Sequence, residues 1–463
     1  MTTFRRAAGL LAAALVVSAC SSSATSAPSA AASAGSAGAG CAVHVLGPIR
    51  TQPGEQDAYQ AVFDAFKQEF NCTVTATWQG QYSDIPQELA AARLANQPVD
   101  IVYDSTFNTS VAQSGSLMDL TKIIAPIKDR FIPAAVDDYS LGGHVWAIPF
   151  SDISTTFVYY NQTLFQQLGL QAPKTYQELV SVAQKIKSAK GIDPMIHRGK
   201  EAGYWPIWFM AAYAQTTGNQ SIANTGAFLT GKRPINADQQ ATQALQAIAQ
   251  FYKDGILGQD SLATDGPGME AAFLQQKAAM FFDGSWDLPD LRKANPSFEV
   301  GIFAFPQIVS GATQQSAGAA DNGWAISSST TNLAMAAQFL EFLTRPANAS
   351  KVLSTWNPLD PSVVGVPSGS DPLAQQIASQ FRPNTIEYLD WIWPTEVTDA
   401  MSQAIPAALT GTQDAQTALT SVQQAYTTIV SQKKYTFDWW TTWTNDQWAK
   451  VTPSPVPQLK IGQ

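Results

Sequence analysis

Two hydrophobic periods alternate along the chain after residue 41. Short apolar runs at 43–46, 73–78 and 99–103 have the length and the β-branched content of buried strands. Between the first two runs, apolar residues recur at the spacing of one helix face: Tyr59, Val62, Phe63, Phe66 and Phe70. A second helix is expected around 85–95. This β-α-β-α-β order predicts a parallel sheet with helical crossovers.

The remainder of the chain mixes further helices with extended runs. Extended segments are expected at 141–160, 278–284 and 298–305. Helical spacing is found at 175–189, 205–217, 238–253, 269–276, 332–345, 396–409 and 413–431. No fixed-period repeat is visible, which argues against solenoids and propellers. The roughly 420 residues that follow position 40 exceed a single core and indicate two lobes.

The first twenty residues have the pattern of a secretory signal. Arg5 and Arg6 precede an apolar run at 7–17, which is too short to span a bilayer as a helix. The run ends in Val-Ser-Ala-Cys, which resembles the bacterial lipobox. In such signals the thiol of the cysteine, here Cys20, receives a diacylglycerol. The alternative is an ordinary secretory peptide with a chance cysteine.

Residues 21–40 contain only small residues, with no charge and no large apolar side chain. Such a segment cannot offset the entropy cost of folding, so we expect a flexible tether. Beyond residue 41 no apolar stretch approaches 18 residues, and no membrane-spanning helix is expected there.

Net charge limits the kinds of partner, and cysteine content indicates where a lipid and a disulfide would be attached. The net charge of −9, without a basic cluster, argues against nucleic acid as a partner. Of three cysteines, Cys20 is assigned to lipid. Cys41 and Cys72 open the first two predicted strands, and neighbouring parallel strands start side by side. A disulfide between them is therefore reasonable in an oxidising compartment, with two free buried thiols as the alternative.

Four groups of segments resemble family 1 extracellular solute-binding proteins, the family that includes maltose-binding protein. They lie, in family order, at 98–103 with 111–120, at 146–149 with 159–165 and 173–179, at 273–280 with 283–286, and at 323–326 with 337–343. The resemblance implies an α/β, periplasmic-binding-protein-like fold of two lobes. Each lobe would have a mainly parallel sheet flanked by helices, and the ligand cleft would lie between the lobes. The implied lobes are 41–151 plus 305–345 and 152–304 plus 346–463.

The same resemblance implies a function. Proteins of this family capture a solute outside the cytoplasm, close on it by a hinge motion, and deliver it to ABC permease subunits driven by a cytoplasmic ATPase. A sugar, in particular an oligosaccharide, is the expected ligand. We therefore expect a monomer, lipid-anchored on the extracytoplasmic face of the cell membrane, without a metal or cofactor.

Aromatic residues are the first candidates for ligand contact, because sugars present apolar C–H faces. Trp286 follows Asp-Gly-Ser at a position resembling the sugar-stacking aromatic of the family. Tyr204 and Trp205 match another cleft segment, and Asn322 with Trp324 lies at a turn that faces the cleft in relatives. For each tryptophan the alternative is ordinary core packing.

Polar candidates lie at strand ends. Asp104 ends the third predicted strand, where a carboxylate can accept hydrogen bonds from adjacent hydroxyls; its alternative is a helix N-cap. Arg50 and Gln79 lie in the first two strand-end loops and would donate to hydroxyls, or be solvated. Asp152 lies at the first expected crossover between the lobes.

Enzyme signatures are weak. His44, His144 and His197 have no metal-site spacing, and neither HExxH nor GxSxG occurs. Residues 226–232 read as GxxxxGK, but Arg233 replaces the Ser or Thr that would hold magnesium. A carboxylate pair for glycoside hydrolysis depends on geometry, so a glycan-active enzyme stays open as an alternative. The other alternative is a binding protein for a non-sugar solute such as a polyamine, which would need several cleft carboxylates.

Overall fold

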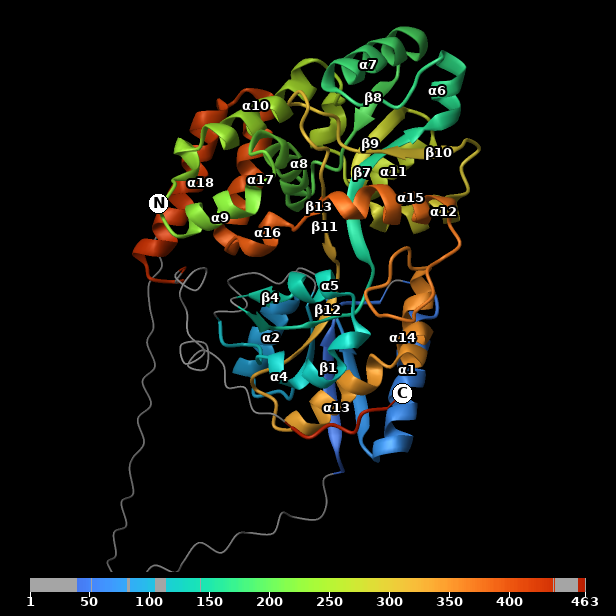
Figure 1. The fold of residues 1–463 in the computed structure, drawn as a ribbon, viewed down its shortest axis with the longest axis vertical. Helices are drawn as coiled ribbons and strands as arrows, with labels where there is room; N and C mark the ends of the chain where they lie inside the picture. Colours follow the sequence, from blue (N-terminus) through green and yellow to red (C-terminus); the bar gives the residue numbers. More distant parts are fainter. Residues whose placement is uncertain are drawn as a thin grey trace, which may run out of the picture. The chain divides into compact units, whose positions relative to one another are not determined.

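The computed structural model describes residues 40–50, 52–80, 84–104, 114–141, 143–435, 437 and 457–462. The predicted signal peptide with Cys20, the tether up to residue 39 and the Trp-rich segment 439–448 lie outside the described residues. Residues Cys41–Gln463 form one compact unit, which contains both predicted lobes (Figure 1).

The first lobe is built on a five-stranded sheet of order β2-β1-β3-β12-β6. Its strands are β1 (Ala42–Gly47), β2 (Thr73–Trp78), β3 (Ile101–Asp104), β6 (Ile148–Pro149) and β12 (Gly323–Ile326). β1 runs parallel to β2 and β3, as the β-α-β-α-β pattern predicts, whereas β12 is antiparallel to both β3 and β6. The sheet is therefore parallel only in its N-terminal half.

Aromatic packing holds the helices of this lobe to the sheet. The helices are α1 (Glu55–Phe70), α2 (Ile85–Leu94), α4 (Thr121–Ile124), α5 (Pro133–Asp138), α13 (Leu333–Leu343) and α14 (Pro346–Leu353). Phe66 of α1 makes edge contacts with Phe339 and Phe342 of α13, at ring distances of 5.3 and 5.4 Å. Fully burying each such side chain stabilises the fold by about 1.5–3 kcal/mol. Asn71, at φ 49°, ends α1 in the left-handed region that Asn tolerates.

The second lobe contains a sheet of order β13-β11-β7-β9-β8, with β10 also paired to β7. Its strands are β7 (Ile153–Asn161), β8 (Asp193–Ile196), β9 (Ala278–Gly284), β10 (Val300–Phe303), β11 (Ser316–Ala320) and β13 (Thr385–Ile386). The pairs β8–β9 and β11–β13 are parallel, and β7 is antiparallel to β9, β10 and β11. The expectation of a mainly parallel sheet is thus wrong for this lobe. Strand β7, buried on both faces along most of its length, organises it.

Long helices cover this second sheet, and the helical periodicity located most of them. They are α6 (Gln162–Leu168), α7 (Tyr176–Lys190), α8 (Pro206–Thr216), α9 (Ser221–Leu229), α10 (Gln239–Lys253), α11 (Gly266–Leu274), α12 (Leu288–Ala294), α15 (Pro372–Gln376), α16 (Leu389–Ile392), α17 (Thr395–Thr410) and α18 (Ala415–Ser431). Helix α8 packs against α10 and α17, so its residues 206–215 are all buried (Figure 1). A small hairpin, β4 (Ser140–Leu141) with β5 (His144–Val145), completes the list of strands.

The lobe boundaries differ from those expected from the sequence. β11 pairs with β7 of the second sheet, whereas β12, which begins only three residues after β11 ends, pairs with β3 of the first. The chain therefore returns to the first lobe near Asp321, not at residue 305. Helix α14 packs on α1, and Val363 and Val366 belong to the same core, so the first lobe extends well past residue 345. Successive extended runs look alike in sequence although they pair with different sheets.

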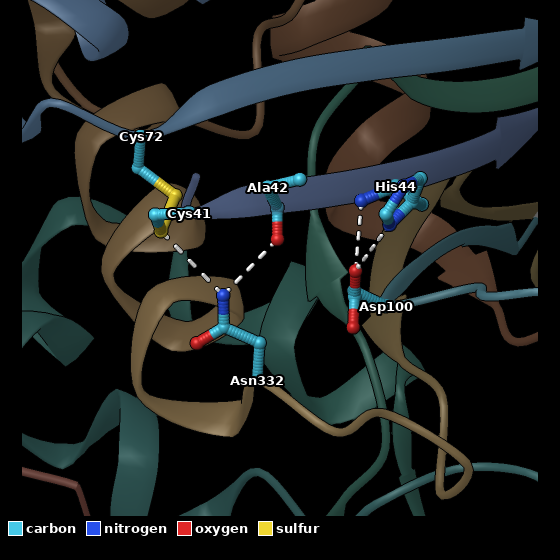
Figure 2. Close-up of a disulfide and its surroundings, with 6 residues drawn as sticks. All are labelled: Cys41, Ala42, His44, Cys72, Asp100 and Asn332. Atoms are coloured by element: carbon cyan, nitrogen blue, oxygen red, sulfur yellow. Dashed lines mark hydrogen bonds and ion pairs between the residues drawn. A yellow bond between two sulfur atoms is a disulfide. The ribbon is translucent and has the colours of Figure 1, made fainter. Parts of the chain in front are cut away.

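A disulfide joins the starts of the first two strands (Figure 2). Cys41 and Cys72 are bonded with their Cα atoms 4.6 Å apart, directly before the paired residues Ala42 and Thr73. The amide of Asn332 donates to the carbonyl oxygen of Ala42 at 3.0 Å and lies 3.6 Å from the Cys41 sulfur. The disulfide therefore fixes the edge strand β2 to β1, and Asn332 ties both to the loop before α13.

Residues 457–462 pack against α13 of the first lobe. Lys460 exchanges two hydrogen bonds with Gln338, its N–H donating at 2.7 Å and its carbonyl accepting at 2.9 Å. The N–H of Gly462 donates to Glu341 at 2.9 Å, and Arg130 donates to the carbonyl oxygen of Gly462. Glu341 is fully buried, so this segment supplies part of the hydrogen bonding that its carboxylate needs.

Removing residues 457–463 is expected to destabilise the first lobe. Deleting donors to a buried carboxylate costs roughly 1–3 kcal/mol, so the melting temperature should fall by several degrees. Lys460→Ala is the matched control, because it removes an exposed side chain and keeps the main-chain hydrogen bonds; it should leave the melting temperature unchanged. Equal melting temperatures for the truncated and the intact protein would show that the segment contributes nothing.

Candidate functional site

A cavity of about 390 Å³ opens beside the crossover between β11 and β12. Residues of both lobes line it. Its aromatic residues are Tyr204, Trp286, Trp356, Tyr388 and Trp391, and its carboxylates are Asp152, Asp321 and Asp390. Flat apolar faces and hydrogen-bond acceptors therefore converge on one space.

Turns at the ends of regular elements position these side chains. Trp286 lies in the turn Ser285–Asp287 directly after β9, and Tyr204 in the turn Ala202–Tyr204 before α8. Asp152 directly precedes β7, Asp321 follows β11, and Asp390 with Trp391 belongs to the short helix α16. The side chains thus come from five different segments, and the two sheets hold those segments in place.

The Trp286 ring lies flat against the backbone of Gly284. A Cβ atom at position 284 would come within 2.2 Å of the indole, so glycine is required there. Tyr204 lies beside the indole, with ring centroids 6.3 Å apart. The indole Nε1 has no hydrogen-bond partner among the described residues. Trp286 therefore lines the cavity with an aromatic ring whose Nε1 is itself buried.

Arg198 packs against this aromatic pair through the Tyr204 ring. The guanidinium of Arg198 lies 3.8 Å from the Tyr204 ring centroid and donates to Glu201 at 2.5 Å. Its Nη1 is also 3.6 and 3.8 Å from carboxylate oxygens of Asp283 and Asp287. Burial raises the pKa of Asp283 to about 7, although the charge of Arg198 opposes that shift. Arg198 is thus surrounded by acidic groups.

The three carboxylates that line the cavity differ in the hydrogen bonds that they accept. Both oxygens of Asp152 accept backbone hydrogen bonds, from Leu359 at 2.7 Å and from Asp360 at 3.3 Å. Oδ1 of Asp390 is buried and has no partner among the described residues. Burial raises the pKa of Asp152 and of Asp390 to about 7, and that of Asp321 to about 6. Asp390 is therefore the one of the three with a buried oxygen that has no partner among the described residues.

Four of the residues predicted from the sequence come together at this cavity: Trp286, Tyr204, Asn322 and Asp152. Trp205 and Trp324 do not line it. Trp205 is fully buried, donates from Nε1 to the carbonyl oxygen of Gly199 at 3.0 Å, and supports the turn that carries Tyr204. Trp324 packs in the core of the first lobe, its ring 4.9 Å from that of Tyr103. For both, the alternative of core packing describes the observed position.

The polar candidates from the first two strand ends form hydrogen bonds with other residues of the protein. Arg50 is buried; it donates to the Pro48 carbonyl oxygen at 2.9 Å and to Glu55 at 3.2 Å, and its guanidinium lies over Tyr103. Gln79 donates to Glu88 at 2.7 Å. Neither residue lines the cavity. Asp104 ends β3 opposite Gly323, and its side chain lies outside the described part of the structure.

Among the aromatic and acidic residues that line the cavity, sequence reasoning missed five: Asp321, Trp356, Tyr388, Asp390 and Trp391. One signal was available for the last three. The stretch 388–393 reads Tyr-Leu-Asp-Trp-Ile-Trp, a density of aromatic residues around a carboxylate that resembles the composition expected of a sugar site. Trp356 follows α14 in a turn that has no distinctive pattern.

Three acidic residues lie close together next to this site. Glu387, which directly follows β13, lies close to Asp137 and Asp138 of α5, and Asp138 accepts a hydrogen bond from the Ala320 N–H at 2.7 Å. Burial, and secondarily these like charges, raises the pKa of Glu387 to about 8, and burial raises that of Asp138 to about 7.

Glu387→Gln is expected to stabilise the protein at high pH. A carboxyl with a raised pKa in the folded state stabilises the fold below its unfolded pKa, and this contribution is lost as the pH rises through the folded value. The wild type should therefore lose stability between about pH 4.5 and pH 8, which the glutamine variant avoids. We expect a gain of about 1–3 kcal/mol at pH 8.5 and none at pH 4.5, measured by denaturant unfolding. The exposed Glu299→Gln is the control; a gain independent of pH would refute the explanation.

Two negative findings apply to the described residues. They contain no group of three or more His, Cys, Asp and Glu side chains placed to hold a metal ion. Among their helices, none combines the length and the apolar character that crossing a bilayer requires.

Comparison with known proteins gives a consistent result. The family model of bacterial extracellular solute-binding proteins matches residues 52–350. The multiple sugar-binding protein of Streptococcus mutans is 28% identical over 241 residues, which are 50% of this chain and 53% of that protein. The chain thus spans about half the length of that relative. The sn-glycerol-3-phosphate-binding periplasmic protein of Agrobacterium fabrum is 22% identical over 81% of this chain and 90% of its own.

Solved structures show the same fold. A chitin oligosaccharide binding protein superimposes with a TM-score of 0.71, at 21% identity over 84% of this chain and 99% of its own. The solute-binding protein RafE in complex with raffinose gives 0.66, at 21% identity over 84% and 99%. At such identities the likeness establishes the two-lobed α/β architecture.

Proposed function

Because the chain belongs to the bacterial extracellular solute-binding protein family, we propose that it captures a sugar, in particular an oligosaccharide, for an ABC importer. The observation that carries this proposal is the cavity of about 390 Å³ lined by five aromatic residues and three carboxylates. Its volume lies within the range of about 300–1,000 Å³ that is typical of small-molecule sites.

The chemistry of the cavity suits a sugar ring. Trp286 and Tyr204 offer flat surfaces for the C–H face, and each aromatic contact of this kind adds about 0.5–1.5 kcal/mol beyond the area that it buries. Asp390, Asn322 and Gln52 supply acceptors and donors at the rim for hydroxyl groups. A hydroxyl donating to a carboxylate makes a charge-assisted bond, roughly twice as strong as a neutral one.

The relatives support this choice. One relative is named for multiple sugars, and two structural neighbours are a raffinose complex and a chitin oligosaccharide binding protein. Other relatives are named for binding sn-glycerol 3-phosphate, and the lining of the cavity argues against such a ligand here. A phosphate ligand would need cationic or N–H donors, whereas none of the described residues that line the cavity is Lys, Arg or His.

The mode of action follows from the two sheets. The cavity is lined from both lobes, so closure of one lobe against the other would enclose the ligand. The loaded protein would then deliver the sugar, unchanged, to permease subunits driven by a cytoplasmic ATPase. We further propose that it acts as a monomer, held on the extracytoplasmic face by lipid at Cys20. Cys20→Ala should release the protein into the medium; retention of that variant on the membrane would refute the anchor.

A ligand screen tests the function. Residues 41–463 are melted in the presence of mono- and oligosaccharides, with spermidine, amino acids and phosphate as comparison solutes. A ligand that binds only the folded state raises the melting temperature, by an amount that corresponds to about 2.7 kcal/mol at 100 times Kd. A shift with one sugar family and no consumption of that sugar supports the proposal. A shift only with a comparison solute, or hydrolysis of the sugar, would contradict it.

A further inference from the structure

The ionisable carboxyl side chains that line the cavity are not matched by any cationic side chain among its described lining residues. Asp152, Asp321 and Asp390 line it, and no cationic side chain is found among the described residues of its wall. Asp321 lies close enough to Asp152 to oppose its ionisation, and Asp390 reaches the cavity from α16. Burial raises the pKa of Asp152 and of Asp390 to about 7 and that of Asp321 to about 6, so the three carboxyls are partly ionised near neutral pH and have no cationic partner in the described wall of the cavity.

Arg198, which packs against the Tyr204 ring, does not neutralise these three carboxyls either. Arg198 contacts Glu201, Asp283 and Asp287, three carboxylates against one guanidinium. Its face is covered by the Tyr204 ring at 3.8 Å. Arg198 is therefore committed to its neighbours and adds no positive potential toward the ligand.

The Asp390 carboxyl has no cationic partner in the described wall. Both oxygens of Asp152 accept backbone N–H groups, whereas Oδ1 of Asp390 is closed off from solvent, so a ligand would meet the rest of the Asp390 carboxyl. Burial disfavours the ionised form of this carboxyl, and a positive charge beside it would favour that form. Aromatic faces around it, such as that of Trp391 on the same short helix, attract cations as well.

We propose that the cavity selects, among sugars, those that carry a protonated amino group, which would bind at Asp390, and that it rejects sugars that carry phosphate or carboxylate groups. This inference rests on the proposed sugar-binding function and adds the class of substituent that the site prefers. The aromatic residues would contact the sugar ring, and the carboxylates would determine which charged substituents on that ring are accepted.

Matched ligands test the preference by isothermal titration. The probes are chitosan di- to tetrasaccharides, their N-acetylated counterparts, the equivalent gluco-oligosaccharides, and glucosamine with glucose, glucose 6-phosphate and glucuronate. We expect an amino sugar to bind at least tenfold more tightly than its neutral counterpart, with no binding of the anionic sugars. Equal or tighter binding of the neutral, N-acetylated or anionic member would overturn the proposal and leave the sugar function intact. No binding of any amino sugar would likewise overturn the proposal, and the ligand screen then decides the sugar function separately.

Asp390→Asn localises the effect, because it removes the charge with little change of shape. This variant should lose about tenfold or more in affinity for the amino sugar and a smaller factor for the neutral counterpart, so that the preference for the amino sugar disappears. Asp57→Asn, an exposed change of the same charge on α1, should alter neither. If Asp390→Asn weakens both sugars equally, or neither, the amino group does not bind at Asp390.

Discussion

Trp286→Ala should weaken sugar binding by about 1.5–3 kcal/mol, roughly ten- to a hundredfold in Kd. The indole lines the cavity beside Tyr204, with ring centroids 6.3 Å apart. Truncation would remove the stacking face and leave the ring of the ligand against solvent. Isothermal titration with a sugar identified by the ligand screen measures the loss directly.

A conservative variant separates stacking from folding. Trp286→Phe keeps a flat ring and should lose only a few-fold in affinity, because the smaller face still covers the sugar. Trp286 is partly buried at the surface of its core, so the melting temperature of the ligand-free alanine variant should fall by only a few degrees. Full affinity in a folded Trp286→Ala protein would assign Trp286 to packing alone.

Removing the disulfide should have the largest effect on stability. Cys41 and Cys72 are separated by 31 positions, and closing a loop of this length restricts the unfolded chain by about 3–4 kcal/mol in the chain-entropy model. The pair also holds the edge strand β2 to β1. The double variant Cys41→Ser with Cys72→Ser is therefore expected to unfold at clearly lower denaturant concentration and temperature.

Reduction of the wild type provides the matched comparison. Dithiothreitol should lower the melting temperature of the wild type to that of the double serine variant, and it should not change the variant itself. Sugar affinity should persist in the variant below its melting temperature, because the disulfide lies at the start of β1 and β2, whereas the cavity lies beyond β12. Identical melting curves with and without the disulfide would refute this account.

Local periodicity located most elements of the fold. The spacing of Tyr59, Val62, Phe63 and Phe66 predicted α1, whose buried face they form. Thr175, which caps α7 together with Glu178, likewise marks a helix start that is visible in the sequence. Such signals depend on neighbouring residues and are therefore readable from the sequence alone.

Strand pairing was harder to anticipate. β11 and β12 follow each other closely but pair with different sheets, and β11 (Ser-Ala-Gly-Ala-Ala) lacks the β-branched residues that marked the predicted strands. Which strand pairs with which depends on contacts distant in sequence, and a period-2 pattern contains no information about them. The expected boundary at residue 305 and the mainly parallel second sheet were wrong for this reason.

The candidate site likewise combines residues that the sequence predicted correctly as cavity lining with residues that it missed or misplaced. Trp286 and Tyr204, which line the cavity, were predicted because motifs around them resemble those of the family. Trp205 and Trp324 came from equally suggestive motifs but lie in the core. A tryptophan that is stacked on a ligand and one that is packed beneath it differ by a side-chain direction, which sequence spacing does not encode. Asp390 was missed because its role depends on burial and on an unpartnered oxygen.

The most direct test of the central claim is a crystal structure of residues 41–463 with the best oligosaccharide from the screen. The account predicts a sugar ring stacked on Trp286, with polar groups of the ligand within hydrogen-bonding distance of Asp390, enclosed between the two lobes. A ligand bound elsewhere on the surface, or a cavity that remains empty at saturating sugar, would contradict it.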